Sequence, residues 1–155
     1  MPKKYWLMKS EPEHYSFEQL KKDGATGWTA VRNYQARNFM RDQMKLGDGV
    51  LFYHSNADPA AIVGLAEVCH EGHPDPTQFE PKSEYYDPKS KPESPTWIMV
   101  GIKYLAALKH PLTLAELKKV KGLSSMPLLK RGMRLSVQPV SGDEWKIILK
   151  LGQPD

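Results

Sequence analysis

The helical patterns in this chain are all short, and strand patterns lie among them. Each helix is expected to span only about two or three turns, and each begins at a residue able to cap it: Ser16, Asn33, Thr113 and Ser141. Short helices among strands fit a small curled sheet or barrel better than a parallel α/β sheet. We therefore predict an α+β fold, in which a curled β-barrel is decorated with short helices.

Strands are predicted where β-branched, aromatic and aliphatic residues are concentrated: 5–9, 50–55, 61–69, 96–105 and 135–139. Residues 96–105 are apolar on both faces, which predicts a central place in the sheet. Between residues 72 and 95, prolines recur among polar and aromatic residues. This segment is too long and irregular for a tight turn, so we expect an excursion packed on the surface.

A length of 155 residues is typical of one domain, so residues 1–155 are expected to share a single core. The longest apolar stretch, residues 60–66, is far shorter than the roughly 18 residues of a membrane span, and no signal peptide is recognised. Cys69 is the only cysteine, which excludes an internal disulfide and a thiol-based metal site. These features predict a cytoplasmic protein in which Cys69 is a small buried residue rather than a nucleophile.

Charge is distributed unevenly along the chain, although the formal net charge is only +4. Residues 117–142 contain no acidic residue and six basic ones: Lys118, Lys119, Lys121, Lys130, Arg131 and Arg134. Residues 67–93 contain seven acidic residues and three lysines. The molecule is therefore expected to have a basic side and an acidic side. A basic side fits a nucleic-acid partner and fits an ordinary solvated surface equally well.

The densest polar cluster runs from Trp28 to Arg37, at the start of the helix that Asn33 is expected to cap. Unpaired backbone N–H groups and the positive end of the helix dipole favour an anion there, and Arg32 and Arg37 can add charged hydrogen bonds. The cluster predicts a phosphate position, or else a basic surface helix whose asparagine is only a cap.

Aromatic residues also gather at the ends of the predicted elements: Trp6, Trp28, Tyr34, Tyr53 and Trp97. Polar side chains accompany them, namely Ser10, Asn33, His54 and Ser55. An aromatic wall with a few amides and hydroxyls suits a flat heterocycle, because stacking supplies affinity and hydrogen bonds to the ring edge supply discrimination. Several of these aromatic residues, and Trp145 of the last helix, are also expected in the core.

Patterns for catalysis and for metal or cofactor binding are weak. His70 and His73 lie three residues apart, but no third ligand is spaced nearby, so no metal site is predicted. His54 and Ser55 are neighbours on a strand and point to opposite faces, which argues against a Ser-His pair completed by Glu11. Neither a dinucleotide-binding glycine pattern nor a P-loop occurs, and no cofactor is predicted.

Five blocks of the sequence, in order, resemble the EVE domain, a family that includes the thymocyte nuclear protein group and is related to the PUA-like and YTH folds. The blocks are YWLMKSEP at 5–12, VRNYQARN at 31–38, GD at 47–48 with FYHS at 52–55, YYDP at 85–88 and RLSVQP at 134–139. The resemblance covers essentially the whole chain. The resemblance implies a PUA-like barrel with a pocket that accepts a modified nucleobase extruded from RNA or DNA.

Carried onto this chain, the resemblance gives a set of base-binding or ligand-binding candidates: Lys9, Ser10, Glu11, Trp28, Asn33, Tyr34, Tyr53, His54, Ser55, Trp97 and Ser136. The phosphate-binding candidates are Arg32 and Arg37 with the basic segment that follows the third predicted helix: Lys130, Arg131 and Arg134. An extruded base needs stacking surfaces, polar groups for its edge and cations for the flanking phosphates, and these residues provide all three.

We therefore expect a nucleic-acid-binding module that recognises a modified base without catalysis. One alternative is an enzyme acting on a modified nucleotide or small metabolite, with Glu11 or His54 as general base. Another is a module whose aromatic surface binds a protein. A steep loss of affinity with salt would distinguish nucleic acid from protein as the partner.

Overall fold

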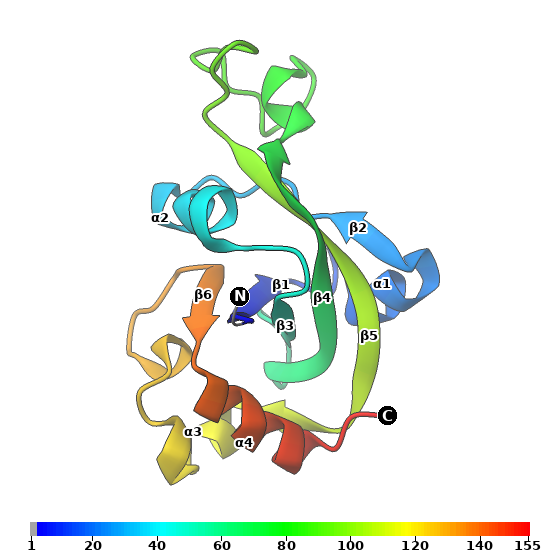
Figure 1. The fold of residues 1–155 in the computed structure, drawn as a ribbon, viewed down its shortest axis with the longest axis vertical. Coiled ribbons are helices and arrows are strands. Elements are labelled where there is room, and N and C mark those ends of the chain that lie inside the picture. Colours follow the sequence, from blue (N-terminus) through cyan, green and yellow to red (C-terminus); the bar gives the residue numbers. More distant parts are fainter. Residues whose placement is uncertain (1–2) are drawn as a thin grey trace.

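The computed structural model describes residues 3–155, which form a mixed α+β fold around one six-stranded sheet (Figure 1). The strands follow the spatial order β2-β5-β4-β3-β1-β6. Their bounds are Tyr5–Ser10 (β1), Ala25–Gly27 (β2), Gly49–His54 (β3), Ala61–Pro74 (β4), Ile98–Thr113 (β5) and Val137–Val140 (β6). Only β1 and β3 pair in parallel; the other neighbours are antiparallel. The predicted α+β class is confirmed.

The predicted closure into a barrel is not confirmed. Pairing ends at β2 on one edge and at β6 on the other, and among residues 3–155 no hydrogen-bonded ladder joins these two strands. The sheet nevertheless bends, since β4 and β5 run side by side along most of the molecule (Figure 1). Their pairing shifts register at four places, and such irregularities let long strands bend.

Strands β4 and β5 are longer than the sequence patterns predicted, because β4 continues to Pro74 and β5 to Thr113. One register shift lies between Val68 and His70, and the intervening Cys69 is exposed rather than buried as expected. An extra residue in a strand is left outside the ladder, so the alternation of faces that predicted burial is interrupted there.

Short helices complete the fold: α1 Phe17–Asp23, α2 Tyr34–Asn38, α3 Leu114–Lys118 and α4 Gly142–Gly152. All four predicted caps are confirmed, since each cap side chain accepts a backbone N–H of the first turn. The helix that Asn33 caps changes character midway, because α2 is followed at once by the π-helical turn η1, Phe39–Gln43. Single-turn 3-10 helices occupy Pro76–Phe79 (η2), Lys121–Leu123 (η3) and Pro127–Leu129 (η4). No helix of residues 3–155 is long and apolar enough to cross a membrane.

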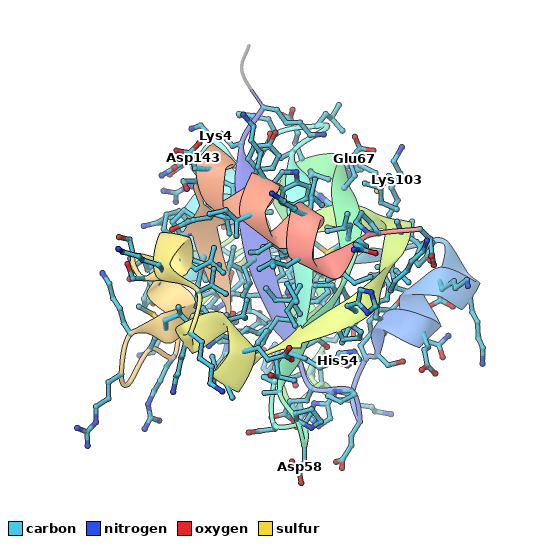
Figure 2. All side chains as sticks on the ribbon, turned by 90° about the horizontal axis from the view of Figure 1, so that it is seen from below. Lys4, His54, Asp58, Glu67, Lys103 and Asp143 are labelled. Atoms are coloured by element: carbon cyan, nitrogen blue, oxygen red, sulfur yellow. The ribbon has the colours of Figure 1, made fainter. Side chains whose placement is uncertain are left out.

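The core has two parts because the sheet is apolar on both faces. Alternate residues separate between them: Trp6 and Met8 belong to one cluster with α1 and α2, whereas Leu7 belongs to the other with α3 and α4. Trp145 of α4 is buried and stacks on Tyr5, as expected. Figure 2 shows α4 crossing this second face.

Candidate functional site

A cavity of about 530 Å³ lies beside the carboxyl end of β1. It is lined by residues 9–11, 14–15 and 26–33, together with Tyr85 and Ser136. Local hydrogen bonds hold the rim together: the Ser10 hydroxyl donates to the carbonyl of Tyr15 at 2.6 Å, and the Lys9 N–H donates to the carbonyl of Ser136 at 2.9 Å. Segments that are far apart in the sequence therefore meet around one hollow of the size typical for small ligands.

Asp75 fixes the shape of the loop between β2 and α2. Ala30 in this loop has a φ of 71°, a backbone conformation that residues other than glycine rarely adopt. Its N–H donates to Asp75 Oδ2 at 2.7 Å, while the N–H and hydroxyl of Thr77 donate to Oδ1 at 2.8 and 2.6 Å. Burial by itself would raise the pKa of Asp75, but the hydrogen bonds from Thr77, Ala30 and Arg32 outweigh it and lower the pKa. The carboxylate is thus kept charged inside the protein.

Arg32 was predicted to contact phosphate, and in this structure its guanidinium is engaged within the protein. Its Nη1 donates to Asp75 and to the carbonyl of Val31, Nη2 donates to Thr77 and Tyr85, and Nε donates to the same Tyr85 carbonyl. These contacts occupy all five N–H groups of a guanidinium. Arg32 therefore ties the cavity loop to the excursion that carries Tyr85, and it has no donor left for an anion.

Tyr34, Trp97 and Arg37 do not line the cavity as predicted but form a stack outside it. The guanidinium of Arg32 lies 5.3 Å from the Trp97 ring, Tyr34 stacks on Trp97 with 5.0 Å between ring centroids, and Arg37 lies 5.0 Å from the Tyr34 ring. Arg37 also donates to Asn38 and to the carbonyl of Thr96. The Trp97 indole donates to Asp87 at 2.8 Å. The stack joins Arg32 of the cavity loop to Trp97 and to Tyr34 of α2, because aromatic and cationic groups attract one another face to face.

Three more predicted ligand residues, Tyr53, His54 and Ser55, do not line the cavity. Tyr53 is buried in the second core cluster. The Nε2 of His54 accepts the N–H of Phe17 at 3.1 Å, and burial lowers the pKa of His54 although Glu18 partly opposes the shift. The Ser55 N–H donates to the carbonyl of Ser10 at 3.0 Å. Figure 2 shows Asp58 at the end of the molecule opposite Lys4, with His54 between these two residues.

Asn33 and Trp28 do line the cavity, and each also has a structural role. The Asn33 side-chain oxygen accepts the N–H of Ala36 at 2.9 Å and so caps α2, while its amide NH₂ has no hydrogen-bond partner among residues 3–155. Trp28 is only 8% exposed and meets Phe52 edge to face, with 5.6 Å between ring centroids. Asn33 is therefore both a helix cap and part of the cavity wall, and Trp28 is both a core residue and part of that wall.

The charged side chains in the cavity differ in how fully they are paired. Glu11 Oε1 accepts from the amide of Asn56, and its Oε2 lies 3.5 Å from Nε2 of His14. The Lys9 ammonium is half-buried and forms no hydrogen bond or ion pair within the described chain; it lies 6.0 Å from the centroid of the Tyr53 ring. Burial lowers the pKa of Lys9.

The basic segment Lys130–Arg134 is outside the cavity lining. Lys130, Arg131 and Arg134 are all exposed, and the segment leads directly to Ser136 on the cavity rim. Its phosphate-binding role stays a prediction. The histidines at 70 and 73 lie close together with 3.9 Å between ring centroids, but among residues 3–155 no group of three or more metal-ligating side chains is found.

Sequence reasoning missed several residues of the cavity wall: His14, Tyr15, Thr26, Gly27, Thr29, Ala30, Val31 and Tyr85. Tyr85 and Val31 belonged to blocks that carried the family resemblance, so a signal for these two existed. The others are small or surface-type residues, and only the path of the backbone places them at the cavity.

Known proteins share this sequence pattern and this architecture. The family model of the EVE domain matches residues 4–151. Human thymocyte nuclear protein 1 is 42% identical over 170 residues, which cover 97% of this chain and 75% of that protein. A hypothetical protein from Leishmania major has a similar solved structure, with a TM-score of 0.92 and 45% identity over 98% of this chain and 96% of the other.

The crystal structure of human THYN1 in complex with DNA containing 5-methylcytosine is equally similar, with a TM-score of 0.91. Its sequence is 41% identical, and the alignment covers 98% of this chain and 99% of that one. With a matching family model over nearly its whole length and relatives above 40% identity, this chain belongs to the EVE domain family.

Proposed function

We propose that this EVE domain binds DNA that carries a modified cytosine, 5-methylcytosine in the first instance, and that the cavity at the end of β1 receives the modified base. The observation that carries the proposal is this cavity, with Trp28, Ser10 and Asn33 on its wall, in a chain that resembles a protein crystallised with 5-methylcytosine DNA. A base stacked inside a duplex cannot reach such a cavity, so it must be turned out of the helix.

The cavity wall offers the groups that a cytosine ring needs. Trp28 and Tyr15 provide aromatic surface for the flat ring and its methyl group. The amide NH₂ of Asn33 can donate to an acceptor on the base edge. The Ser10 hydroxyl donates its proton to the carbonyl of Tyr15, so the Ser10 oxygen can accept a hydrogen bond from an amino group of the base. Exchange of Asn33 or Ser10 should alter discrimination between bases more than overall affinity, whereas loss of the aromatic surface should weaken binding of any base.

Binding without catalysis is part of the proposal, and the pairing of the acidic and basic groups supports it. Glu11 and His54, the alternative general bases, are both engaged in holding loops: Glu11 with Asn56 and His14, and His54 with the N–H of Phe17. The single acceptor nitrogen of a neutral His54 ring is occupied in this way.

The test of the proposed function is a set of binding titrations at fixed salt. Duplexes with one 5-methylcytosine, the same duplexes with cytosine, and RNA of matching sequence should be compared, because phosphate contacts act on all three. The proposal predicts the tightest binding to the methylated duplex. Equal affinity for the methylated and unmodified duplexes would exclude recognition of the modified base.

Replacing Asn33 with serine should separate base recognition from helix capping. Serine caps helices as well as asparagine does, so the free energy of unfolding should change little. It lacks the amide NH₂, so the preference for 5-methylcytosine over thymine at the same position, two bases that share the methyl group but differ in their hydrogen-bonding edge, should fall by about tenfold, the cost of one buried hydrogen bond left unmade. Ratios of the two dissociation constants measure this effect.

Ser16→Ala is the matched control for Asn33→Ser. Ser16 caps α1 in the same way but does not line the cavity. Its loss should lower stability by about 1 kcal/mol and leave base preference unchanged. If Asn33→Ser keeps the wild-type preference, its amide does not contact the base.

A further inference from the structure

The Lys9 side chain is the one charged group of the cavity wall for which the described chain provides no partner. Its ammonium lies within the wall, half-buried, and forms neither a hydrogen bond nor an ion pair with residues 3–155. Arg32, the other strong cation of the wall, has all five N–H groups engaged. The cavity therefore contains a positive charge that the fold itself does not neutralise.

The carboxylates around the cavity are already engaged. Glu11 is held by Asn56 and His14, and Asp75 accepts from Ala30, Thr77 and Arg32. A half-buried ammonium without a hydrogen bond or ion pair costs stability, because burial removes water from the charge and the Tyr53 ring, 6.0 Å away, replaces it only weakly. The lowered pKa of Lys9 reflects the same burial. Such a group contributes little to the fold, so its position is better explained by a ligand.

We propose that Lys9 is the anion-binding residue of the cavity, and that its ammonium pairs with an oxyanion of the bound nucleotide. This inference rests on the proposed function. The oxyanion has two chemical sources: the phosphodiester next to the extruded base, or a carboxylate on the base itself, as in 5-carboxylcytosine. Either would supply the counter-ion that the cavity lacks, and the charge would strengthen the hydrogen bond inside the partly dry wall.

Lys9→Met tests the proposal, because methionine is also unbranched and flexible but carries no charge. Lys21→Met is the matched control: the Lys21 ammonium also lies over a tyrosine ring, 5.9 Å from the centroid of Tyr104, but it is on α1 and does not line the cavity. Each protein should be titrated with a 5-methylcytosine duplex, with the same duplex bearing neutral methylphosphonates beside the modified base, and with a 5-carboxylcytosine duplex.

The proposal predicts that Lys9→Met weakens binding by about tenfold or more, whereas Lys21→Met has no effect. If the phosphate is the source, methylphosphonates weaken binding to the wild type but not to Lys9→Met. If the carboxylate is the source, only the 5-carboxylcytosine duplex loses affinity on substitution. Thermal unfolding of Lys9→Met should show a melting temperature equal to or above that of the wild type, because an unpaired buried charge is removed.

Wild-type affinity of Lys9→Met for all three duplexes would overturn the inference. An equal loss of affinity in Lys9→Met and Lys21→Met would also overturn it. The proposed function is judged separately, by the preference of the wild-type protein for the methylated over the unmodified duplex, so one proposal can fail while the other stands.

Discussion

Replacing Asp75 with alanine is expected to lower the free energy of unfolding by about 3–5 kcal/mol, the usual cost of removing one partner from a buried ion pair. The Asp75 side chain is fully buried and accepts hydrogen bonds from Ala30, Thr77 and Arg32. Alanine would leave the Arg32 charge and two backbone N–H groups without their acceptor. Urea unfolding followed by tryptophan fluorescence measures the loss.

Asp42→Ala is the control for Asp75→Ala. Asp42 also pairs with an arginine, Arg41 at 2.8 Å, but both side chains are about half exposed, so little stability should be lost. A similarly small loss for Asp75→Ala would show that the carboxylate is not needed to hold the loop.

The same carboxylate should make stability depend on pH in the acid range. Because hydrogen bonding lowers the pKa of Asp75 below its ordinary value of 3.8, its contribution is complete above that value. The contribution is lost as the pH falls from there through the lower pKa of the folded protein. Asp75→Asn should therefore show a flatter decline of stability below about pH 4 than the wild type.

Replacing Thr29 with tryptophan is expected to abolish the preference for 5-methylcytosine. Thr29 is exposed and lines the cavity, so an indole at this position would occupy the space proposed for the base at little cost in stability. Affinity for the methylated duplex should fall about a hundredfold or to the level of unmodified DNA, since phosphate contacts outside the cavity remain. Fluorescence anisotropy titrations with both duplexes measure this fall.

Ser125→Trp is the matched control for Thr29→Trp, because Ser125 is a small, exposed, uncharged residue outside the cavity wall. It should bind both duplexes as the wild type does. A Thr29→Trp protein that still prefers the methylated duplex would place the base somewhere other than this cavity.

Local features of the fold could be predicted because their causes are local. The caps at Ser16, Asn33, Thr113 and Ser141 each involve residues within one helical turn, and the sequence identifies them correctly. Strand β2 was missed, because Ala25–Gly27 has no apolar pattern and forms only by pairing with β5. The same long-range pairing extends β4 through polar residues to Pro74.

The cavity was predicted in part. Ser10, Trp28 and Asn33 do meet there, together with Lys9, Glu11 and Ser136. The role of Arg32 could not be foreseen, because its partners Asp75 and Tyr85 are 43 and 53 residues away in the sequence. A basic residue in a polar cluster has the appearance of a phosphate ligand until its own hydrogen bonds are known. Lys9, by contrast, forms no hydrogen bond or ion pair with residues 3–155 of the folded chain.

The central claim is that the modified base enters the cavity beside Trp28, and the methyl group of the base reports on this directly. A duplex with a single ¹³C-methyl-labelled 5-methylcytosine should be titrated with the protein and followed by NMR. The account predicts that the methyl resonance shifts strongly on binding, with NOE contacts to the Trp28 ring, and that Thr29→Trp prevents both changes. A methyl resonance that stays at its position in the unbound duplex while the protein binds would contradict the account.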